Sequence, residues 1–169
     1  SDLASVRAGL AALTSEATAL TKQLATHDGG DTALSHITAA PGFEVALAAA
    51  LGEDLQATLG KGGARDWGGA DAIATPAPNG VTRLIDHVTA PDALAARLAH
   101  IWVAEVDDGR ALPVGVRLVT RDGALRRWDG YHSHGDGAAA AERLRRVNRM
   151  TELTGHMAAE EVAVAQAEA

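Results

Sequence analysis

The feature that most constrains this chain is a heptad pattern of apolar residues in its first segment. Seven apolar residues follow one another at alternating spacings of three and four positions. They are Leu3, Val6, Leu10, Leu13, Ala17, Leu20 and Leu24. This a/d spacing predicts an α-helix with one narrow apolar stripe, which needs a partner helix to cover it. We therefore expect residues 1–27 to form one arm of a coiled coil.

A second helical segment, with a looser seam, is expected at residues 138–166. It follows Gly135 and Gly137, and its seam positions are Leu144, Val147, Met150, Leu153 and Met157. Because a globular stretch separates the two segments, antiparallel packing of one helix on the other is the simplest way to cover both seams. One alternative stays open, in which both segments are ordinary bundle helices of a self-contained domain.

Residues 34–134 predict a mixed domain of the α+β (mixed α/β) class between these arms. The glycine- and aspartate-rich run at 26–31 is expected to end the first helix. Pro41-Gly42 is expected to open a helix over 43–51, which Gly52 closes. Further elements are predicted as a short strand or turn at 34–39, short strands at 55–59 and 71–75, a helix over 93–100 and an apolar run at 101–106.

A β-hairpin is the clearest prediction in the second half of this domain. The stretches 116–120 and 124–128 flank Asp122-Gly123, a dipeptide that favours a tight hairpin turn. Two strand-helix-strand passages thus follow one another between the arms. We expect two small subdomains fused into one core.

Charge and composition exclude several classes of protein. The formal net charge of -7 opposes general nucleic-acid binding, so any DNA contact must come from a local basic patch. The chain has no cysteine, which excludes disulfides and thiolate metal sites and fits a reducing cytoplasm. Neither a membrane span nor a signal sequence is recognisable. The expectation is a soluble cytoplasmic protein with no membrane partner.

Two groups of residues resemble the hinge of bacterial SMC (structural maintenance of chromosomes) proteins. Pro41-Gly42-Phe43-Glu44, followed by Ala50-Leu51-Gly52, resembles the opening of that domain. The run 117–125, with Val119-Thr120 and Asp122-Gly123 and then Asp129-Gly130, resembles its close. The likeness covers most of 34–137 and includes the flanking heptads. One departure is the run 130–137, where many members carry a glycine pair.

The resemblance implies a homodimer. In this family two hinges join through two equivalent contacts, where sheet edges and glycines of one protomer meet the other. The matching glycines here are Gly123, Gly130, Gly135 and Gly137. The hairpin at 116–128 is our candidate for the sheet edge, because an unpaired edge is a template for a partner strand. The alternative for each glycine is that it only makes a tight turn.

The family likeness also implies weak, salt-dependent DNA contact near the junction of hinge and coil. The candidate basic residues are Lys22, Arg126, Arg127, Arg143, Arg145, Arg146 and Arg149. On a helix, Arg145, Arg146 and Arg149 share a face. The alternative is a solvated coiled-coil face that Glu142 and Glu152 balance.

No catalytic site and no metal site are expected. The chain has no phosphate-binding loop of the GxxxxGK[ST] type and no GxSxG or HExxH motif. His132-Ser133-His134 with Asp136 has zinc ligands, but we expect it in a loop too mobile to hold the ion. The resemblance implies no cofactor in this chain, since ATP, Mg and kleisin-type partners belong to the family's head domains beyond both termini.

The sequence therefore predicts a homodimerisation hinge of a chromosome-associated SMC protein. One rival interpretation is a small α/β ligand-binding or enzymatic domain with incidental terminal helices. Another is a nucleic-acid-binding module in which dimerisation is secondary. Pairing of the two terminal helices with each other distinguishes the hinge from the first rival.

Overall fold

The computed structural model describes residues 2–25, 31–72, 76–135 and 137–169. The chain divides into two compact units, one made of Ser1–Asp28 with Arg145–Ala169 and the other of Gly29–Leu144. The predicted helix end at 26–30 and the candidate ligand Asp136 lie outside the described residues. Among the described helices, none has the length and apolar character that crossing a bilayer requires.

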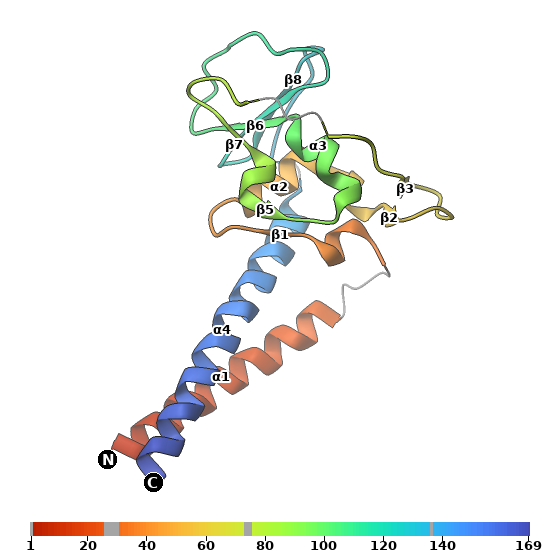
Figure 1. Ribbon diagram of the computed structural model, residues 1–169. Coiled ribbons are helices and arrows are strands. Elements are labelled where there is room, and N and C mark those ends of the chain that lie inside the picture. Colours follow the sequence, from red (N-terminus) through yellow and green to blue (C-terminus); the bar gives the residue numbers. More distant parts are fainter. Residues whose placement is uncertain (1, 26–30, 73–75, 136) are drawn as a thin grey trace. The chain divides into compact units, whose positions relative to one another are not determined.

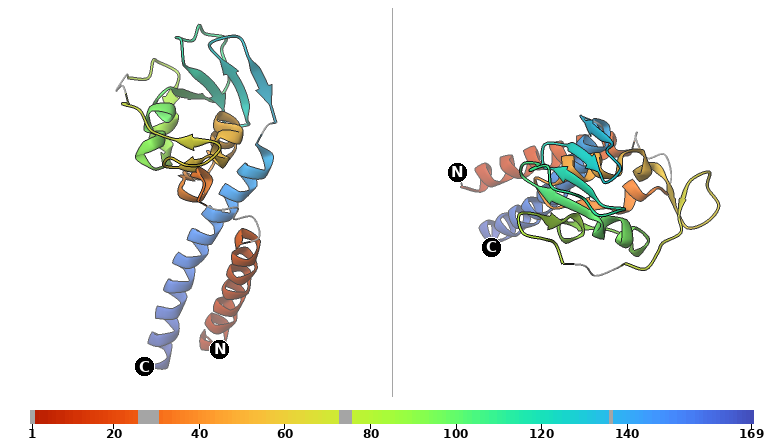
Figure 2. Two further views of the ribbon diagram at one scale, coloured as in Figure 1. Left: turned by 90° about the vertical axis from the view of Figure 1, so that its right-hand side faces the viewer. Right: turned by 90° about the horizontal axis from the view of Figure 1, so that it is seen from above.

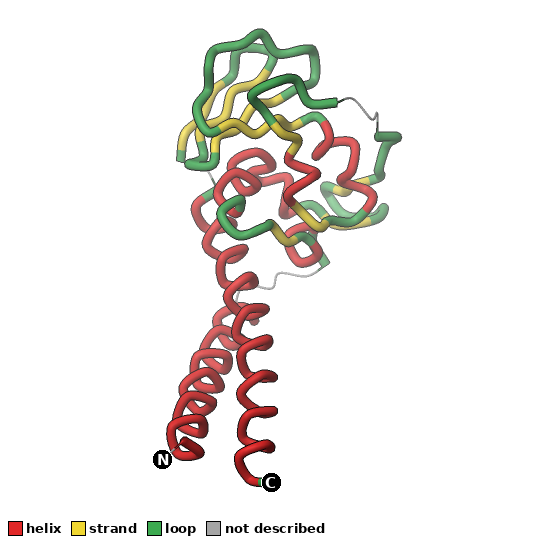
Figure 3. The backbone as a smooth tube through the Cα atoms, turned by 60° about the vertical axis from the view of Figure 1, so that its left-hand side comes forward, coloured by secondary structure: helices red, strands yellow, loops and turns green. Residues whose placement is uncertain are grey.

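The first unit is a pair of antiparallel helices, α1 (Asp2–Ala25) and the later part of α4 (Ala138–Glu168). Arg7 forms an ion pair with Glu168, and Glu16 forms one with Arg149. Residue numbers rise along α1 as those of its partners fall along α4, so the helices run in opposite directions. They lie side by side with both termini at the same end of the pair (Figures 1 and 3). We call this unit the helix pair.

Burial along α1 follows the heptad pattern. Its seven seam positions are buried or half-buried, and every other described residue of α1 is exposed. On α4, Leu153 is buried and Val147, Met150 and Met157 are half-buried. Leu144 differs, because it packs in the core of the 29–144 unit together with Ala141. The seam that α4 offers to the helix pair therefore begins after Leu144.

The second unit is built on a five-stranded sheet in the order β4-β6-β7-β8-β9. Figure 2 gives two further views of it. We call this unit the hinge domain, after the resemblance noted above. These strands are β4 (Thr82–Arg83), β6 (Ile101–Ala104), β7 (Arg117–Thr120), β8 (Ala124–Arg127) and β9 (His132–His134). Within this sheet β6 and β7 pair in parallel, and the β4-β6, β7-β8 and β8-β9 pairs are antiparallel. Two smaller sheets pair β1 (Thr38–Ala39) with β5 (Val88–Thr89) and β2 (Thr58–Leu59) with β3 (Asp66–Trp67).

Helix α2 (Glu44–Leu51) is the centre of the domain core. It packs against β7 and β8, and its Ala- and Leu-rich sequence is buried on nearly every side, as a helix with no polar stripe must be. Gly52, with φ 54°, ends it and donates its N–H to the carbonyl oxygen of Ala48. The remaining helical segments are α3 (Ala95–Ala99) and four 3₁₀ turns at Ala33–His36, Gly52–Gln56, Leu84–His87 and Asp92–Leu94.

The main predicted elements are present, but several short ones differ. Of the strand expected at 55–59, residues 55–56 belong to the 3₁₀ turn Gly52–Gln56, and Thr58–Leu59 are in a sheet. The strand expected at 71–75 is wrong for the described residues 71–72, which are irregular; the nearby strand is Asp66–Trp67. Strands β4, β5 and β9 were not predicted, because runs of two or three residues show no periodicity.

Candidate dimerisation edge and basic residues

A tight turn after β8 places strand β9. The N–H of Arg127 donates to the carbonyl oxygen of Tyr131 at 2.8 Å, and the N–H of Gly130 donates to that of Arg127 at 3.1 Å. Gly130 has φ 89°, in the left-handed region that favours glycine. The side chain of Arg127 fastens the turn through an ion pair with Asp129 at 2.9 Å. The chain therefore reverses here, and β9 returns antiparallel to β8.

Strand β9 forms one edge of the sheet. Among the described strands its only neighbour is β8, with Ser133 opposite Leu125. Hydrogen-bonded and non-hydrogen-bonded positions alternate along an antiparallel ladder. Because Tyr131 is hydrogen-bonded to β8, Ser133 is the next such position, and the backbone groups of His132 and His134 point away from β8. This edge thus presents unpaired donors and acceptors.

The prediction that the hairpin at 116–128 forms the sheet edge is wrong. Its strand β7 lies between β6 and β8, and β8 is covered by β9. The residues that cover it, 132–134, were expected to be a loop, because glycines flank them. What forms the edge is therefore the strand that follows the hairpin.

Two large exposed aromatic side chains flank the turn before β9. Trp128 is 47% exposed and Tyr131 is 45% exposed, whereas Phe43 is half-buried and stacked on His87. Exposed aromatic residues next to an unpaired strand are typical of protein interfaces, where they supply a large contact area. No sequence pattern singled out Tyr131.

The four candidate interface glycines occupy different environments. A Cβ atom on Gly123 would lie 2.9 Å from the side chain of Val45, and one on Gly137 would lie 2.7 Å from the carbonyl oxygen of Ala48. Both glycines thus pack against α2 within their own chain. Gly130 and Gly135 are exposed, with no atom near the position of an added Cβ. A role of all four in a dimer stays a prediction.

Two candidate DNA-binding arginines of the hinge domain are held by carboxylates. Arg126 donates to both carboxylate oxygens of Asp107, at 2.8 and 2.9 Å, and Arg127 pairs with Asp129. The hydrogen bond from Arg126 lowers the pKa of Asp107, and that from Arg127 lowers the pKa of Asp129. These arginines therefore fasten the loop before β7 and the turn before β9, a role that the sequence did not reveal.

The other basic candidates lie on the helices. Arg143 is in the hinge domain, and Lys22, Arg145, Arg146 and Arg149 are in the helix pair. Arg149 donates to Glu16 at 2.8 Å and to Glu152 at 3.1 Å, which raises its pKa. DNA contact by this set stays a prediction.

The histidine pair on β9 has no third metal ligand among the described residues, and no cluster of three His, Cys, Asp or Glu that could hold a metal occurs there. His132 and His134 are both exposed and, at alternate positions of one strand, share a face. Our expectation of a mobile loop at this place is wrong, since β9 is paired to β8 over its whole length.

The hinge-like order of elements and the helix pair agree with comparisons to known proteins. The chain is 38% identical over 128 residues to the chromosome partition protein Smc of Rhodopseudomonas palustris, which covers 72% of this chain and 11% of that protein. It is 37% identical over 133 residues to Smc of Cereibacter sphaeroides, covering 73% and 12%. The chain thus spans only about a ninth of these relatives. No protein-family profile matches it.

Solved structures give the same fold. An asymmetric dimer of the Geobacillus stearothermophilus SMC hinge domain matches with a TM-score of 0.66 and 19% identity, over 97% of this chain and 91% of that one. The chain belongs to the SMC hinge family. The Pyrococcus furiosus SMC hinge domain matches with a TM-score of 0.52 and 14% identity, over 78% and 89% of the two chains. The paired terminal helices of this SMC hinge are also what distinguishes it from the rival small α/β domain.

Proposed function

We propose that this SMC hinge joins two copies of its chain into a homodimer through the free edge of β9. The observation that carries the proposal is the unpaired backbone of His132 and His134 beside the exposed side chains of Trp128 and Tyr131. A strand edge is a template for a partner strand, and the aromatic rings add apolar area that water leaves on association. The hinge of Geobacillus stearothermophilus, which shares the fold, forms an asymmetric dimer.

In the longer protein the dimer would join two SMC subunits at the end of their coiled-coil arms. ATPase heads would lie at the far ends of those arms and supply ATP and Mg binding and kleisin contacts. The hinge would then hold the two arms together while ATP-driven changes act on chromosomal DNA. This role explains why a domain without a family-specific catalytic motif carries two long helices.

The first test is the solution mass of the chain by sedimentation over a wide range of protein concentration. A mass near twice 17.3 kDa that persists on dilution supports the proposal. A monomer at every concentration overturns it.

A second test places the interface at β9 by removing one outward backbone donor. His134→Pro deletes the N–H that points away from β8 and leaves the hydrogen-bonded position Ser133 intact, since proline is tolerated at sheet edges. His134→Ala is the matched control, because it removes the same imidazole and keeps the N–H. We expect at least about a tenfold weaker dimer for the proline variant only. Equal dimerisation by both variants would place the interface elsewhere.

We also propose that the arginines of α4 give this hinge modest affinity for DNA. Four of them, Arg143, Arg145, Arg146 and Arg149, lie within two turns of one helix. The attraction would come from counterion release and would fall steeply with salt. Charge reversal of Arg145, Arg146 and Arg149 to Glu should abolish binding of a short duplex in a titration at low salt. Retained binding with an unchanged salt dependence would rule out this face.

A further inference from the structure

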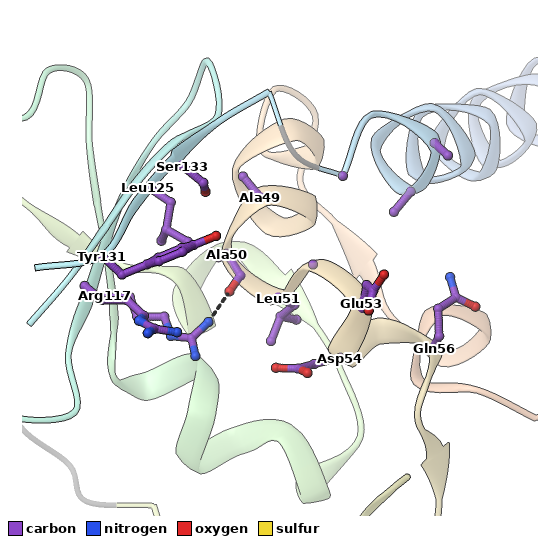
Figure 4. A pocket seen from close by; sticks show the side chains of 15 residues that line it. Ala49, Ala50, Leu51, Glu53, Asp54, Gln56, Arg117, Leu125, Tyr131 and Ser133 are labelled. Atoms are coloured by element: carbon purple, nitrogen blue, oxygen red, sulfur yellow. Dashed lines mark hydrogen bonds between the residues drawn. The ribbon is translucent and has the colours of Figure 1, made fainter. Parts of the chain in front are cut away.

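A cleft in the hinge domain lies between the C-terminal end of α2 and strands β7 to β9. Its volume is about 680 Å³, and its lining comes from α2, the following 3₁₀ turn, the sheet and the start of α4. Figure 4 shows the guanidinium of Arg117 and the ring of Tyr131 on one side, with Glu53 and Asp54 on the other. The backbone around Gly52 forms the floor between them.

Arg117 is the cation of this cleft that lacks a carboxylate. Its Nη1 donates to the carbonyl oxygen of Ala50 at 3.1 Å, at the C-terminal end of α2. Within the described part of the chain no carboxylate forms an ion pair with Arg117. Arg117 is half-buried, and a guanidinium that is partly removed from water and has no anion beside it is poorly compensated.

Two neighbouring arginines add positive charge near Arg117, which favours the binding of an anion. Arg97 contacts two residues that line the cleft. It donates to the carbonyl oxygen of Ala50 at 3.5 Å and to Asp54 at 2.9 Å, and its buried Nε has no acceptor among the described residues. Arg127 lines the cleft, with its guanidinium 4.4 Å from the ring centroid of Tyr131. Burial, and then the like charges of Arg97 and Arg127, lower the pKa of Arg117. An anion bound beside Arg117 would offset the burial of its charge and the repulsion from Arg97 and from Arg127.

The carboxylates on the opposite side limit the size of the ligand. Glu53 has a side chain 94% exposed, and Asp54 has one 47% exposed. A long polyanion laid across this side would be repelled, whereas a single tetrahedral group can reach Arg117 and remain separated from them. Arg117, whose Nη1 also donates to Ala50, offers a planar fork for such a group. Arg127 binds Asp129 through Nε and Nη2, so it adds its Nη1 as a further donor.

We propose that the cleft between α2 and β9 binds a small oxyanion of the phosphate or sulfate class, held by Arg117 and Arg127 beside Tyr131. The site is formed by residues of one chain, and it shares Tyr131 with the strand edge that we propose as the dimer contact. Inorganic phosphate is the simplest probe. Its affinity should be in the millimolar range, since one or two guanidinium forks contact a small and strongly hydrated anion.

The test is a titration of the full chain with sodium phosphate at constant ionic strength, followed by the amide NMR shifts of Gly52, Tyr131 and Ser133. Arg117→Gln removes the free cation, and Arg83→Gln is the matched control, because Arg83 pairs with Asp86 and does not line the cleft. We expect about tenfold or greater weakening in Arg117→Gln and unchanged affinity in Arg83→Gln. Arg117→Lys, which keeps the charge without the fork, should fall between them.

Several outcomes overturn the site. Phosphate shifts absent from the three amides, or equal affinity of Arg117→Gln and wild type, remove the role of Arg117. A short DNA duplex that displaces phosphate and is itself lost in Arg117→Gln would assign the cleft to a polyanion. Sedimentation of the same samples separates these results from a failure to dimerise.

Discussion

The two units of this hinge are stabilised by different amounts of buried surface. In the hinge domain, α2 and the sheet enclose a continuous core that includes Leu47, Leu84 and Ile101, all without measurable exposure. In the helix pair, the described residues that are buried are Ala17 and Leu153. The rest of its seam is only half-buried. A domain core and a two-helix seam thus differ in how much apolar area each residue removes from water.

This difference has a consequence for the family role. A thin seam contributes little stability per helical turn, so the stability of a helix pair depends on its length. A short helix pair is only marginally stable when isolated. The stability of a closed core does not depend on the length of a helix, and its close packing can hold an interface in a fixed geometry. The hinge domain is therefore suited to hold a lasting contact between subunits, whereas the two helices of the helix pair can separate more easily.

The largest expected effect compares one leucine from each unit. Leu47→Ala leaves a cavity in the hinge domain core and should lower the free energy of unfolding by about 2–5 kcal/mol. Leu20→Ala removes a half-buried seam residue and should cost about 1 kcal/mol. Urea unfolding followed by circular dichroism measures both. Equal costs would contradict the distinction between core and seam.

A smaller effect, with opposite signs in the two units, is expected for two glycines. Gly137→Ala forces a Cβ to 2.7 Å from the carbonyl oxygen of Ala48 at φ 79°, so it should destabilise the chain by about 1–3 kcal/mol. Gly155→Ala lies within α4 with open space around it and should stabilise by about 0.5–1 kcal/mol. Thermal unfolding of the two variants gives the comparison. A stabilising Gly137→Ala would show that this glycine is not needed for packing on α2.

The smallest effect concerns one ion-paired carboxylate in each unit. Hydrogen bonds from Arg126 and Arg149 lower the pKa values of Asp107 and Glu16. Each pair therefore stabilises the fold above the unfolded pKa, and that stabilisation is lost as the pH falls through the lower folded pKa. Asp107→Asn and Glu16→Gln should both reduce the loss of stability between pH 7 and pH 3.

The reduction should be larger for Asp107→Asn. The Asp107 side chain is 28% exposed and that of Glu16 is 44% exposed, so solvent screens the pair in the helix pair more strongly. Urea midpoints at the two pH values measure this. A larger change for Glu16→Gln would reverse the order of the two regions.

The sequence predicted the parts of the molecule that carry a periodic or local signal. The heptads of α1, the Ala- and Leu-rich helix α2 and the Asp122-Gly123 hairpin all appear where their patterns indicate them. Strand β9 could not be predicted in this way, since its three residues are all polar and show no apolar alternation. They form a strand because they pair with β8. The two-residue strands β4 and β5 depend likewise on distant partners.

The candidate functional residues show the same difference between local sequence signals and contacts that form only in the fold. The sequence identifies the basic residues but not their carboxylate partners. Asp107 and Arg126, for example, are 19 positions apart and meet only in the folded domain. The arginine cleft was missed in part for the same reason. Arg117 and Arg127 are opposite each other across the predicted hairpin, but Arg97 lies on α3 and no local pattern relates it to them.

The start of α4 determines how a mechanical load enters the hinge domain. Gly137 seats the chain against the backbone of α2, and Ala141 and Leu144 are buried in the same core a turn or two later. Only three residues separate this anchored turn from the edge strand β9. Tension along α4 is therefore borne by packed side chains and not by a loose linker. A pull on α4 would therefore meet the packed core of the hinge domain before it reached the strand edge that we propose as the dimer contact.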